Sequence, residues 1–190
     1  NAFVDPNIPA EGTSIYQIKD QYKFSIDYNH AFFGDYKTRV SLFGEYRSGR
    51  PYSLTMIDRG TGRLPVFGTV GNGSRVLLYV PQLNDPRVVF DSAATETAFN
   101  NLVDQFGLKR GAVVRKNSEQ SPDFFKVDLH VGQEIPTFIG KSRIEVYADI
   151  ENVLNLIDSD WGSLRQVAFP QTAAAVTVVD RRGKGTPVAG

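Results

Sequence analysis

The two histidines are the only imidazole groups in the chain, so they are the first candidates for metal binding or proton transfer. Zinc sites commonly place two histidines at a spacing such as H-x₃₋₅-H. His30 and His130 have no second histidine at such a spacing. We therefore expect both imidazoles to lie on the polar faces of strands and to hold no metal.

The other short motifs that could carry chemistry are incomplete. Asp158 and Asp160 are spaced like the opening of a calcium loop, but the later glycine and glutamate are missing, which predicts a turn. Gly183-Lys184 lacks the glycine spacing and the Ser/Thr of a phosphate-binding loop. No serine occupies a Gly-x-Ser-x-Gly elbow, and no carboxylate pair is singled out. The sequence predicts no catalytic, cofactor-binding or metal site, and no enzyme.

Composition excludes further classes of function. The chain has 190 residues, with 21 Lys+Arg against 21 Asp+Glu, so it has no basic footprint for nucleic acid. It contains no cysteine, which excludes disulfides and thiolate chemistry. No apolar run reaches the roughly 18 residues of a membrane-spanning helix. The opening Asn1-Ala2 and the Gly/Lys/Pro-rich tail at 181–187, expected to be unstructured, lead us to expect that residues 1–190 are one fragment of a longer protein.

Period-two alternation is the strongest structural signal. Tyr22, Phe24, Ile26 and Tyr28 share one face of a predicted strand, and polar residues share the other. After a turn at Gly34-Asp35 the alternation resumes from residue 40 to residue 47. Residues 22–53 are therefore predicted to form a first hairpin.

Residues 124–151 repeat this unit as a second hairpin, with a turn through Pro136 and Gly140. Each predicted strand has about 9–11 residues, the length that crosses a bilayer at a tilt of about 45°. Strands of soluble proteins are typically shorter, at about 5–6 residues.

Residues 54–123 join the hairpins and do not continue the period-two alternation. Glycines between residues 60 and 73 predict turns and loop rather than core elements. The apolar run 76–80 is a candidate short strand. A helix is predicted at 92–106, capped by Asp91 or Ser92 and ended by Gly107. Residues 152–190 are expected to form a further loop and a strand near 173–179.

The arrangement of turns favours a membrane barrel. The two turns within the hairpins are short and lie at one end of the strands, whereas the connection at the other end spans about 70 residues, as in outer-membrane barrels. Aromatic residues near both strand ends are placed as two interfacial girdles would require. These are Phe32, Phe33 and Tyr36 at one end and Tyr46 and Tyr52 at the other. A soluble sandwich with ordinary rim aromatics is an equal alternative on these patterns alone.

Several stretches resemble the C-terminal barrel strands of TonB-dependent outer-membrane receptors, in particular the Oar-like group. The main carrier is residues 149–156, Asp-Ile-Glu-Asn-Val-Leu-Asn-Leu, followed by Asp160-Trp161-Gly162. Supporting stretches, in order and spacing, are residues 47–53, 78–81, 85–86, 121–122, 127–129 and 133–134. The resemblance covers about residues 22–162.

The resemblance implies a mainly antiparallel β fold: a segment of a transmembrane β-barrel, with two long hairpins and a long extracellular loop that contains one short helix. Such receptors also have an N-terminal plug that binds TonB, a barrel of about 22 strands and a final aromatic strand, none of which this sequence displays. The implied location is the outer membrane of a Gram-negative cell. The implied partners are membrane lipid, the plug of the parent chain, TonB through that plug, and an unidentified ligand. The isolated fragment is expected to be inactive, with dimerisation as one way to cover its apolar face.

The polar faces of the predicted strands carry charges of both signs, which suits pairing between strands on a solvated lumen wall. A substrate-selective path is the functional alternative, and no individual ligand-binding residue is nominated. A self-contained extracellular β-sandwich that binds a ligand or glycan is the second hypothesis. The charged positions are Lys23, Asp27, Arg39, Glu45, Arg47, Lys126, Asp128, Arg143, Glu145, Asp149 and Glu151.

Overall fold

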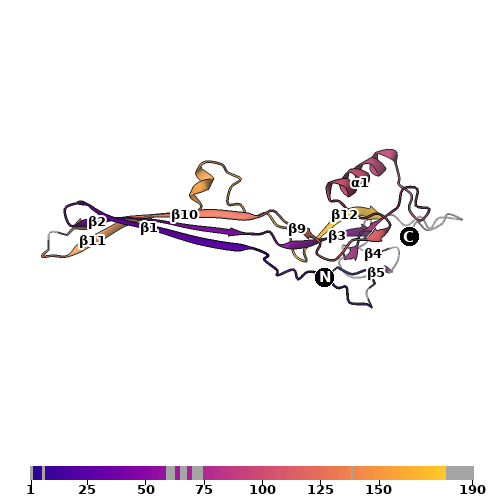
Figure 1. Ribbon diagram of the computed structural model, residues 1–190, viewed down its shortest axis with the longest axis horizontal. Coiled ribbons are helices and arrows are strands. Elements are labelled where there is room, and N and C mark those ends of the chain that lie inside the picture. Colours follow the sequence, from indigo (N-terminus) through magenta and orange to yellow (C-terminus); the bar gives the residue numbers. More distant parts are fainter. Residues whose placement is uncertain are drawn as a thin grey trace. The chain divides into compact units, whose positions relative to one another are not determined.

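The computed structural model describes residues 2–5, 7–58, 63–64, 68–69, 75–137 and 139–178. This part of the chain is mainly antiparallel β with one short α-helix, as the sequence predicts. It divides into two compact units (Figure 1). Unit 2 comprises residues 18–49 and 122–166, and unit 1 comprises residues 1–17, 50–121 and 167–190.

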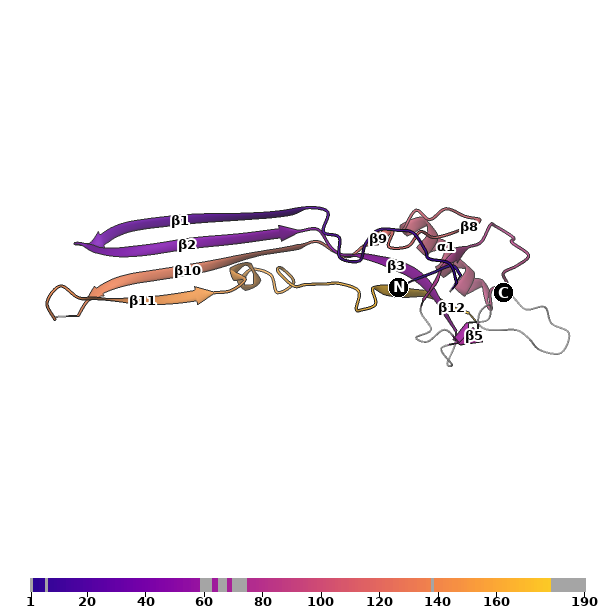
Figure 2. The same cartoon turned by 90° about the horizontal axis from the view of Figure 1, so that it is seen from below.

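Unit 2 is built on one antiparallel sheet with the strand order β1-β2-β10-β11 (Figure 2). Gly34 and Gly140 lie in the two hairpin turns with φ of 61° and 62°, a conformation that costs glycine little. Two hairpins form in the regions where the sequence predicts them, and Gly34 and Gly140 lie in the connections as expected. The strands are β1 (Gln21–Phe33), β2 (Tyr36–Arg47), β10 (Phe124–Pro136) and β11 (Arg143–Ile150).

The first hairpin is shorter than the predicted span of 22–53, because β2 ends at Arg47. The Ser48 hydroxyl accepts hydrogen bonds from the backbone N–H groups of Lys19 and Asp20, which turns the chain out of the sheet. Pro51 then opens β3 (Pro51–Asp58), which belongs to unit 1. Proline is tolerated at the first position of a strand.

Asp123 joins the two hairpins beside the start of β10. Its carboxylate accepts a 2.7 Å hydrogen bond from the Tyr46 hydroxyl and a 3.0 Å bond from the Gly49 N–H. These bonds, the tyrosine's first, lower the pKa of the Asp123 carboxyl. The carboxylate therefore ties the end of β2 to the start of β10.

Unit 1 is assembled around β3 from three separate stretches of chain. The predicted late strand is present as β12 (Thr172–Val178), and it pairs with β3 in parallel orientation. On the other side β3 pairs antiparallel with β6 (Val76–Leu77), and its first residues pair with β9 (Glu119–Gln120). β7 (Tyr79–Val80) pairs with β8 (Ala112–Val113), so the apolar run 76–80 does form short strands. A further short pair is β4 (Arg63–Leu64) with β5 (Gly68–Thr69).

The helix α1 (Ala93–Gln105) confirms the predicted helix and both of its boundaries to within one residue. The Ser92 hydroxyl caps the N-terminus by accepting from the Thr95 N–H at 3.1 Å. At the other end Gly107 has φ of 59°, and Leu108 donates to the Val103 carbonyl, as in a Schellman motif.

Residues 54–123, predicted to form a long loop with one helix and a candidate short strand, also supply the hydrophobic core of unit 1. Leu54, Leu78, Val80, Phe99 and Val103 form a buried hydrophobic cluster between the sheet and α1. These residues come from β3, from the 76–80 run and from α1, and only the fold brings these segments together. Of the glycines that predicted turns, Gly68 lies in β5 and the others lie outside the described residues.

A three-residue clamp fixes the chain after β7. The Asp85 carboxylate accepts from the Arg87 side chain at 2.8 and 2.9 Å and from the Tyr79 hydroxyl at 2.7 Å. The hydrogen bonds from Arg87, and after them the bond from Tyr79, hold the pKa of Asp85 far below its ordinary value. Asp85 is 8% exposed, so the clamp closes over a buried carboxylate.

We predict that Asp85→Asn destabilises unit 1 at neutral pH. The folded-state pKa is lowered, so the carboxylate stabilises the fold fully above the unfolded value of about 3.9 and less as the pH falls towards the folded value. Unfolding monitored by far-ultraviolet circular dichroism at pH 7 and at about pH 2 should show the difference between wild type and variant shrinking at the lower pH. Asp104→Asn, which leaves the clamp intact, is the control. A difference that is independent of pH would contradict an electrostatic role.

Candidate functional site

The four strands of unit 2 align their apolar positions into one continuous face. Ile26 pairs with Leu42, Leu42 with Leu129, and Leu129 with Ile150, so one apolar row crosses all four strands. The neighbouring rows follow the same register, because successive residues of a strand alternate between faces. This apolar face is the first candidate site, and its opposite, the polar face, is the second.

The apolar face lies open over much of its extent. Ile26 and Val146 are each 58% exposed, although both side chains are wholly hydrocarbon. Monomeric soluble proteins seldom expose a contiguous apolar patch of more than a few hundred Å². Ten large hydrophobic side chains on this face are exposed: Tyr22, Phe24, Ile26, Tyr28, Phe125, Val131, Ile135, Ile144, Val146 and Ile150.

Polar and small residues on the apolar face are accommodated locally. The Thr38 hydroxyl donates to the Gln133 side chain on the neighbouring strand. Gln133 in turn donates to the Glu134 carbonyl at 2.8 Å, so its amide is bonded within the protein. Opposite Gly44 the ring of Phe24 lies flat across the strand pair, where a Cβ at residue 44 would meet it at 2.0 Å. Gly44 thus leaves room for an aromatic ring on this face.

The predicted aromatic girdles are found in part. Tyr22 and Tyr46 stack at 5.8 Å between centroids at the end of the sheet that carries Asp123. Phe32 and Phe33, at the opposite end, are 57% and 67% exposed. The prediction for Tyr52 is wrong, because Tyr52 lies in β3 and packs against the core of unit 1.

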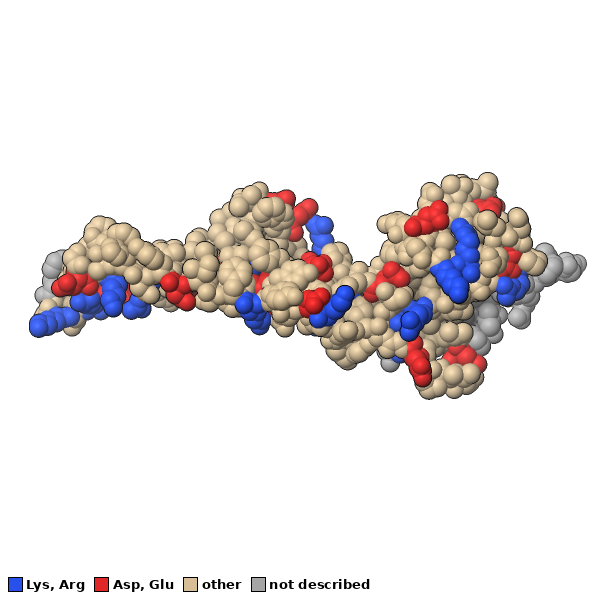
Figure 3. All heavy atoms as spheres, in the orientation of Figure 1, with Lys and Arg blue, Asp and Glu red and all other residues tan. Residues whose placement is uncertain are grey.

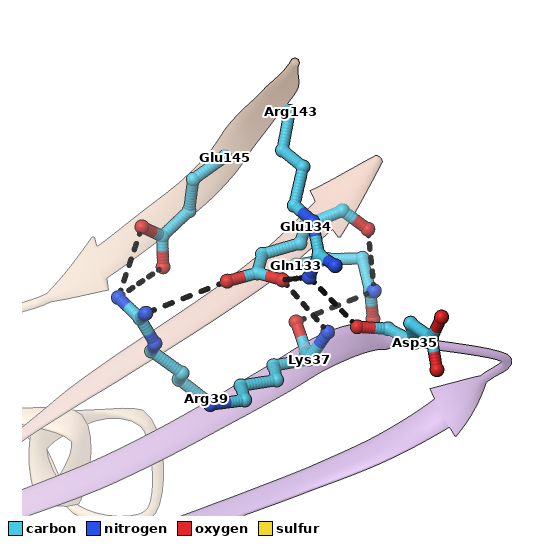
Figure 4. A network of polar contacts seen from close by, with 7 residues as sticks. All are labelled: Asp35, Lys37, Arg39, Gln133, Glu134, Arg143 and Glu145. Atoms are coloured by element: carbon cyan, nitrogen blue, oxygen red, sulfur yellow. Dashed lines mark hydrogen bonds and ion pairs between the residues drawn. The ribbon is translucent and has the colours of Figure 1, made fainter. Parts of the chain in front are cut away.

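Charged residues of both signs lie next to one another on the surface of the described residues (Figure 3). On the polar face of unit 2 they form a network across β2, β10 and β11 (Figure 4). Glu134 accepts from Arg143 at 2.7 Å and from Arg39 at 3.5 Å, and Arg39 also reaches Glu145 at 3.1 Å. Glu134 further accepts from the backbone N–H of Lys37. The predicted pairing between strands is therefore present for Arg39, Arg143 and Glu145.

Glu134 is the centre of this network, although it is not among the charged positions predicted from the sequence. Its side chain is 13% exposed, compared with 42% for Arg143. The signal was available, because Glu134 follows Asp128 and His130 at even spacing on the same strand face. Lys126 bonds Asp128 within β10 at 2.7 Å, so that pair joins residues of one strand.

Gly132 leaves room for the ion pair between Arg39 and Glu145. These two residues lie on β2 and β11, and Gly132 lies between them on β10. A Cβ at residue 132 would come within 2.6 Å of the Glu145 carboxylate and 3.3 Å of His130 Nε2. The missing side chain therefore opens the space in which the charges from the two flanking strands meet.

The predicted position of His130 is confirmed and that of His30 is wrong. His130 lies on the polar face, where Nδ1 is 2.6 Å from Asp149 and the ring stacks on Tyr147. His30 lies at an even position of β1, and its ring contacts Tyr28 and Phe32 on the apolar side. The alternation that begins at Tyr22 already assigns His30 to that side.

A serine, a histidine and an aspartate share one row of the polar face without forming a catalytic triad. Ser41 pairs with His130, and His130 pairs with Asp149 across neighbouring strands. A nucleophilic serine requires a hydrogen bond from its hydroxyl to the histidine. The Ser41 hydroxyl instead bonds Asp27 on the other side. The row therefore holds the serine away from the imidazole that would activate it.

The segment after β11 contains a turn closed by side-chain hydrogen bonds, as the spacing of Asp158 and Asp160 predicts. The Asp158 side chain accepts from the Asp160 N–H at 2.9 Å, and Asp160 pairs with Arg165. Asn152 has φ of 53° and donates to the Trp161 carbonyl, which closes the loop that contains η1 (Val153–Leu156). Gly183-Lys184 and the 181–187 tail lie outside the described residues.

Among the described residues, no group of three or more His, Asp or Glu side chains is arranged to hold a metal ion. The described residues include no helix with the length and apolar character that crossing a membrane requires.

Comparison of the chain with protein-family models, with curated proteins and with solved structures finds no match.

Proposed function

We propose that the sheet of unit 2 is a set of four neighbouring strands in an outer-membrane β-barrel, with its apolar face towards lipid and its polar face towards the lumen. The observation that carries this proposal is the apolar face, which is exposed and continuous across β1, β2, β10 and β11. Three of these strands have 12 or 13 residues, which corresponds to about 40 Å of extended chain. That length exceeds the apolar band of about 25 Å even when the strands tilt by 35–45°.

The magnitude of the exposed apolar surface favours lipid over water. Burying one large apolar side chain contributes roughly 1.5–3 kcal/mol. Ten such side chains, each about half exposed, correspond to the order of 10 kcal/mol. This is comparable with the whole stability of a typical domain, about 5–15 kcal/mol. A hydrocarbon environment removes this cost.

The open edges of the sheet imply further strands. Among the described residues, the outer edges of β1 and β11 pair with no other strand. Backbone groups in hydrocarbon must be hydrogen-bonded, so an open sheet edge is not tolerated there. In this proposal the other strands of the barrel come from the rest of a longer protein.

The sequence resemblance extends the proposal to a TonB-dependent receptor of the Oar-like group in the outer membrane of a Gram-negative cell. In such a receptor, energy delivered through TonB moves a plug and admits a ligand. The charged network centred on Glu134 would then line the lumen and face the plug. The chain itself is proposed to be neither an enzyme nor a complete transporter, and its ligand is not assigned.

The alternative of an extracellular β-sandwich needs a second sheet over the apolar face. The described part of unit 2 contains one sheet, so no observation favours that alternative. Away from lipid, the apolar faces of two copies would cover each other, which makes a homodimer the proposed form of the isolated chain in water.

Site-directed spin labelling tests the orientation of the two faces, and the chain has no native cysteine to interfere. Single cysteines replace Ile26 and Val146 on the apolar face, and Ser25 and Tyr147 on the polar face. In detergent micelles or lipid vesicles, labels at residues 26 and 146 should collide more with oxygen, which is concentrated in hydrocarbon. Labels at 25 and 147 should collide more with a water-soluble nickel complex.

The control is the same set of labels in about 6 M guanidinium chloride, where the two faces should become equivalent. Equal access of both reagents to all four labels in the folded, micelle-bound protein would refute a lipid-facing sheet.

The close approach of the Glu145 carboxylate to Gly132 allows a second test, which concerns the charged network on the polar face. We predict that Gly132→Ala displaces the Glu145 carboxylate and uncouples it from Arg39. A double-mutant cycle with Arg39→Gln and Glu145→Gln should give roughly 0.2–1 kcal/mol of coupling in the parent chain and about zero in Gly132→Ala.

The cycle between Lys126 and Asp128 is the control and should be unaffected, because that pair lies outside the network centred on Glu134. Unchanged coupling between Arg39 and Glu145 in the Gly132→Ala background would show that the glycine is not needed for the pair.

A further inference from the structure

Unit 1 contains a hollow of about 380 Å³ between α1 and the segment that follows β7. Its lining combines the helix face with residues 81–85 and 88–90, and Arg110 closes one side. Pockets for small molecules start at about 300 Å³ and combine apolar walls with a few polar groups. The hollow lies within unit 1, so its geometry is independent of how the sheet of unit 2 is used.

The wall formed by residues 81–90 is held in place by bonds within the protein. The Asp85 carboxylate is already bonded to Tyr79 and Arg87, so Asp85 holds the wall in position and does not offer its charge to a ligand. Gln82 lies over Gly111, where a Cβ would come within 2.3 Å of its amide nitrogen. The hollow is therefore shaped before any ligand enters, which reduces the entropy lost on binding.

The facing wall is one side of α1. Ala93, Glu96 and Asn100 are spaced three and four residues apart and line the hollow, and the buried core residues Phe99 and Val103 lie next to them around the helix. The small side chain of Ala93 leaves room beside Glu96. These three positions contribute nothing to the hydrophobic core, so core packing does not explain their residue types.

The polar groups of the lining retain hydrogen-bonding capacity. Asn100 uses its oxygen to accept from Arg110 at 2.9 Å, which leaves its NH₂ and most guanidinium N–H groups for a ligand. Glu96 forms no ion pair among the described residues, and Asn84 offers both an amide donor and an acceptor. The lining thus offers both hydrogen-bond donors and acceptors.

We propose that this hollow binds a neutral saccharide. One cation, Arg110, and one free anion, Glu96, balance each other, so a charged ligand would gain from one and be repelled by the other. Hydroxyl groups both donate and accept, so adjacent hydroxyls of a sugar can satisfy Glu96 and Asn100 together. Leu83 and Val89 are 69% and 57% exposed and offer apolar surface to the C–H face of a sugar ring.

Titration of the isotope-labelled chain, monitored by NMR, tests this inference. The protein is held in a zwitterionic detergent, because sugar-headed detergents would compete. The probes are maltotetraose, cellotetraose and chitotetraose, with triglycine and inorganic phosphate as ligands of other chemistry. At least one tetrasaccharide should shift the side-chain amide signals of Asn84 and Asn100. Glu96→Gln and Arg110→Ala should each weaken that binding by about tenfold or more.

Matched controls are Asp104→Asn on the same helix and Lys109→Ala beside Arg110, neither of which lines the hollow; both should bind as the parent does. Glu96→Gln keeps the shape of an exposed side chain, so it reports on binding even if Arg110→Ala perturbs the fold.

The saccharide inference fails if no tetrasaccharide shifts these signals at about 10 mM, if triglycine or phosphate binds in their place, or if binding is indifferent to both variants. None of these results bears on the spin-label test of the two sheet faces, so the two proposals can fail separately.

Discussion

The pairing of β2 with β10 is the contact on which the rest of unit 2 depends. Each hairpin is local in sequence, but this pairing joins residues that lie between 77 (Arg47 and Phe124) and 95 (Thr38 and Gln133) positions apart. Its register makes the apolar rows of the two hairpins coincide, and a slip of one residue would turn one hairpin's apolar side towards the charges of the other. Asp123 fixes the register at one end of the sheet, and the Glu134 network fixes it at the other.

The same register separates two environments across a single layer of backbone. On one side, side chains such as Ile26 and Val146 are more than half exposed among the described residues. On the other side, charges pair between strands, and the absence of a side chain at Gly132 lets partners from β2 and β11 meet above β10. Surface ion pairs of this kind contribute little stability individually, so their clearest effect is on register.

The sequence was informative wherever structure follows local periodicity. Alternation identified the four long strands, and Ser92 and Gly107 marked the ends of α1 because capping depends on neighbouring residues. It failed for the core of unit 1, where Leu54, Leu78 and Phe99 come from separate segments whose contact only the tertiary fold creates. The sequence-based prediction put His30 on the polar face, although its even spacing from Tyr28 assigns it to the apolar face. The same alternation assigns Glu134 to the polar face, but Glu134 was not predicted to join the charged positions there. No sequence motif predicts the hollow beside α1, because the residues that line it come from three stretches of chain.

The parallel pairing of β12 with β3 constrains the order of assembly. β3 ends at Asp58 and β12 begins at Thr172, so during synthesis the central strand of unit 1 emerges long before its neighbour. The second hairpin lies between them in the chain and can form from adjacent residues as soon as it is made. Closing the long loop that unites β3 with β12 carries an entropy cost that grows slowly with length, by about 0.6 kcal/mol for each doubling. Unit 1 is therefore complete only once residues 172–178 are in place, and a chain that ended before residue 172 would leave one edge of β3 unpaired.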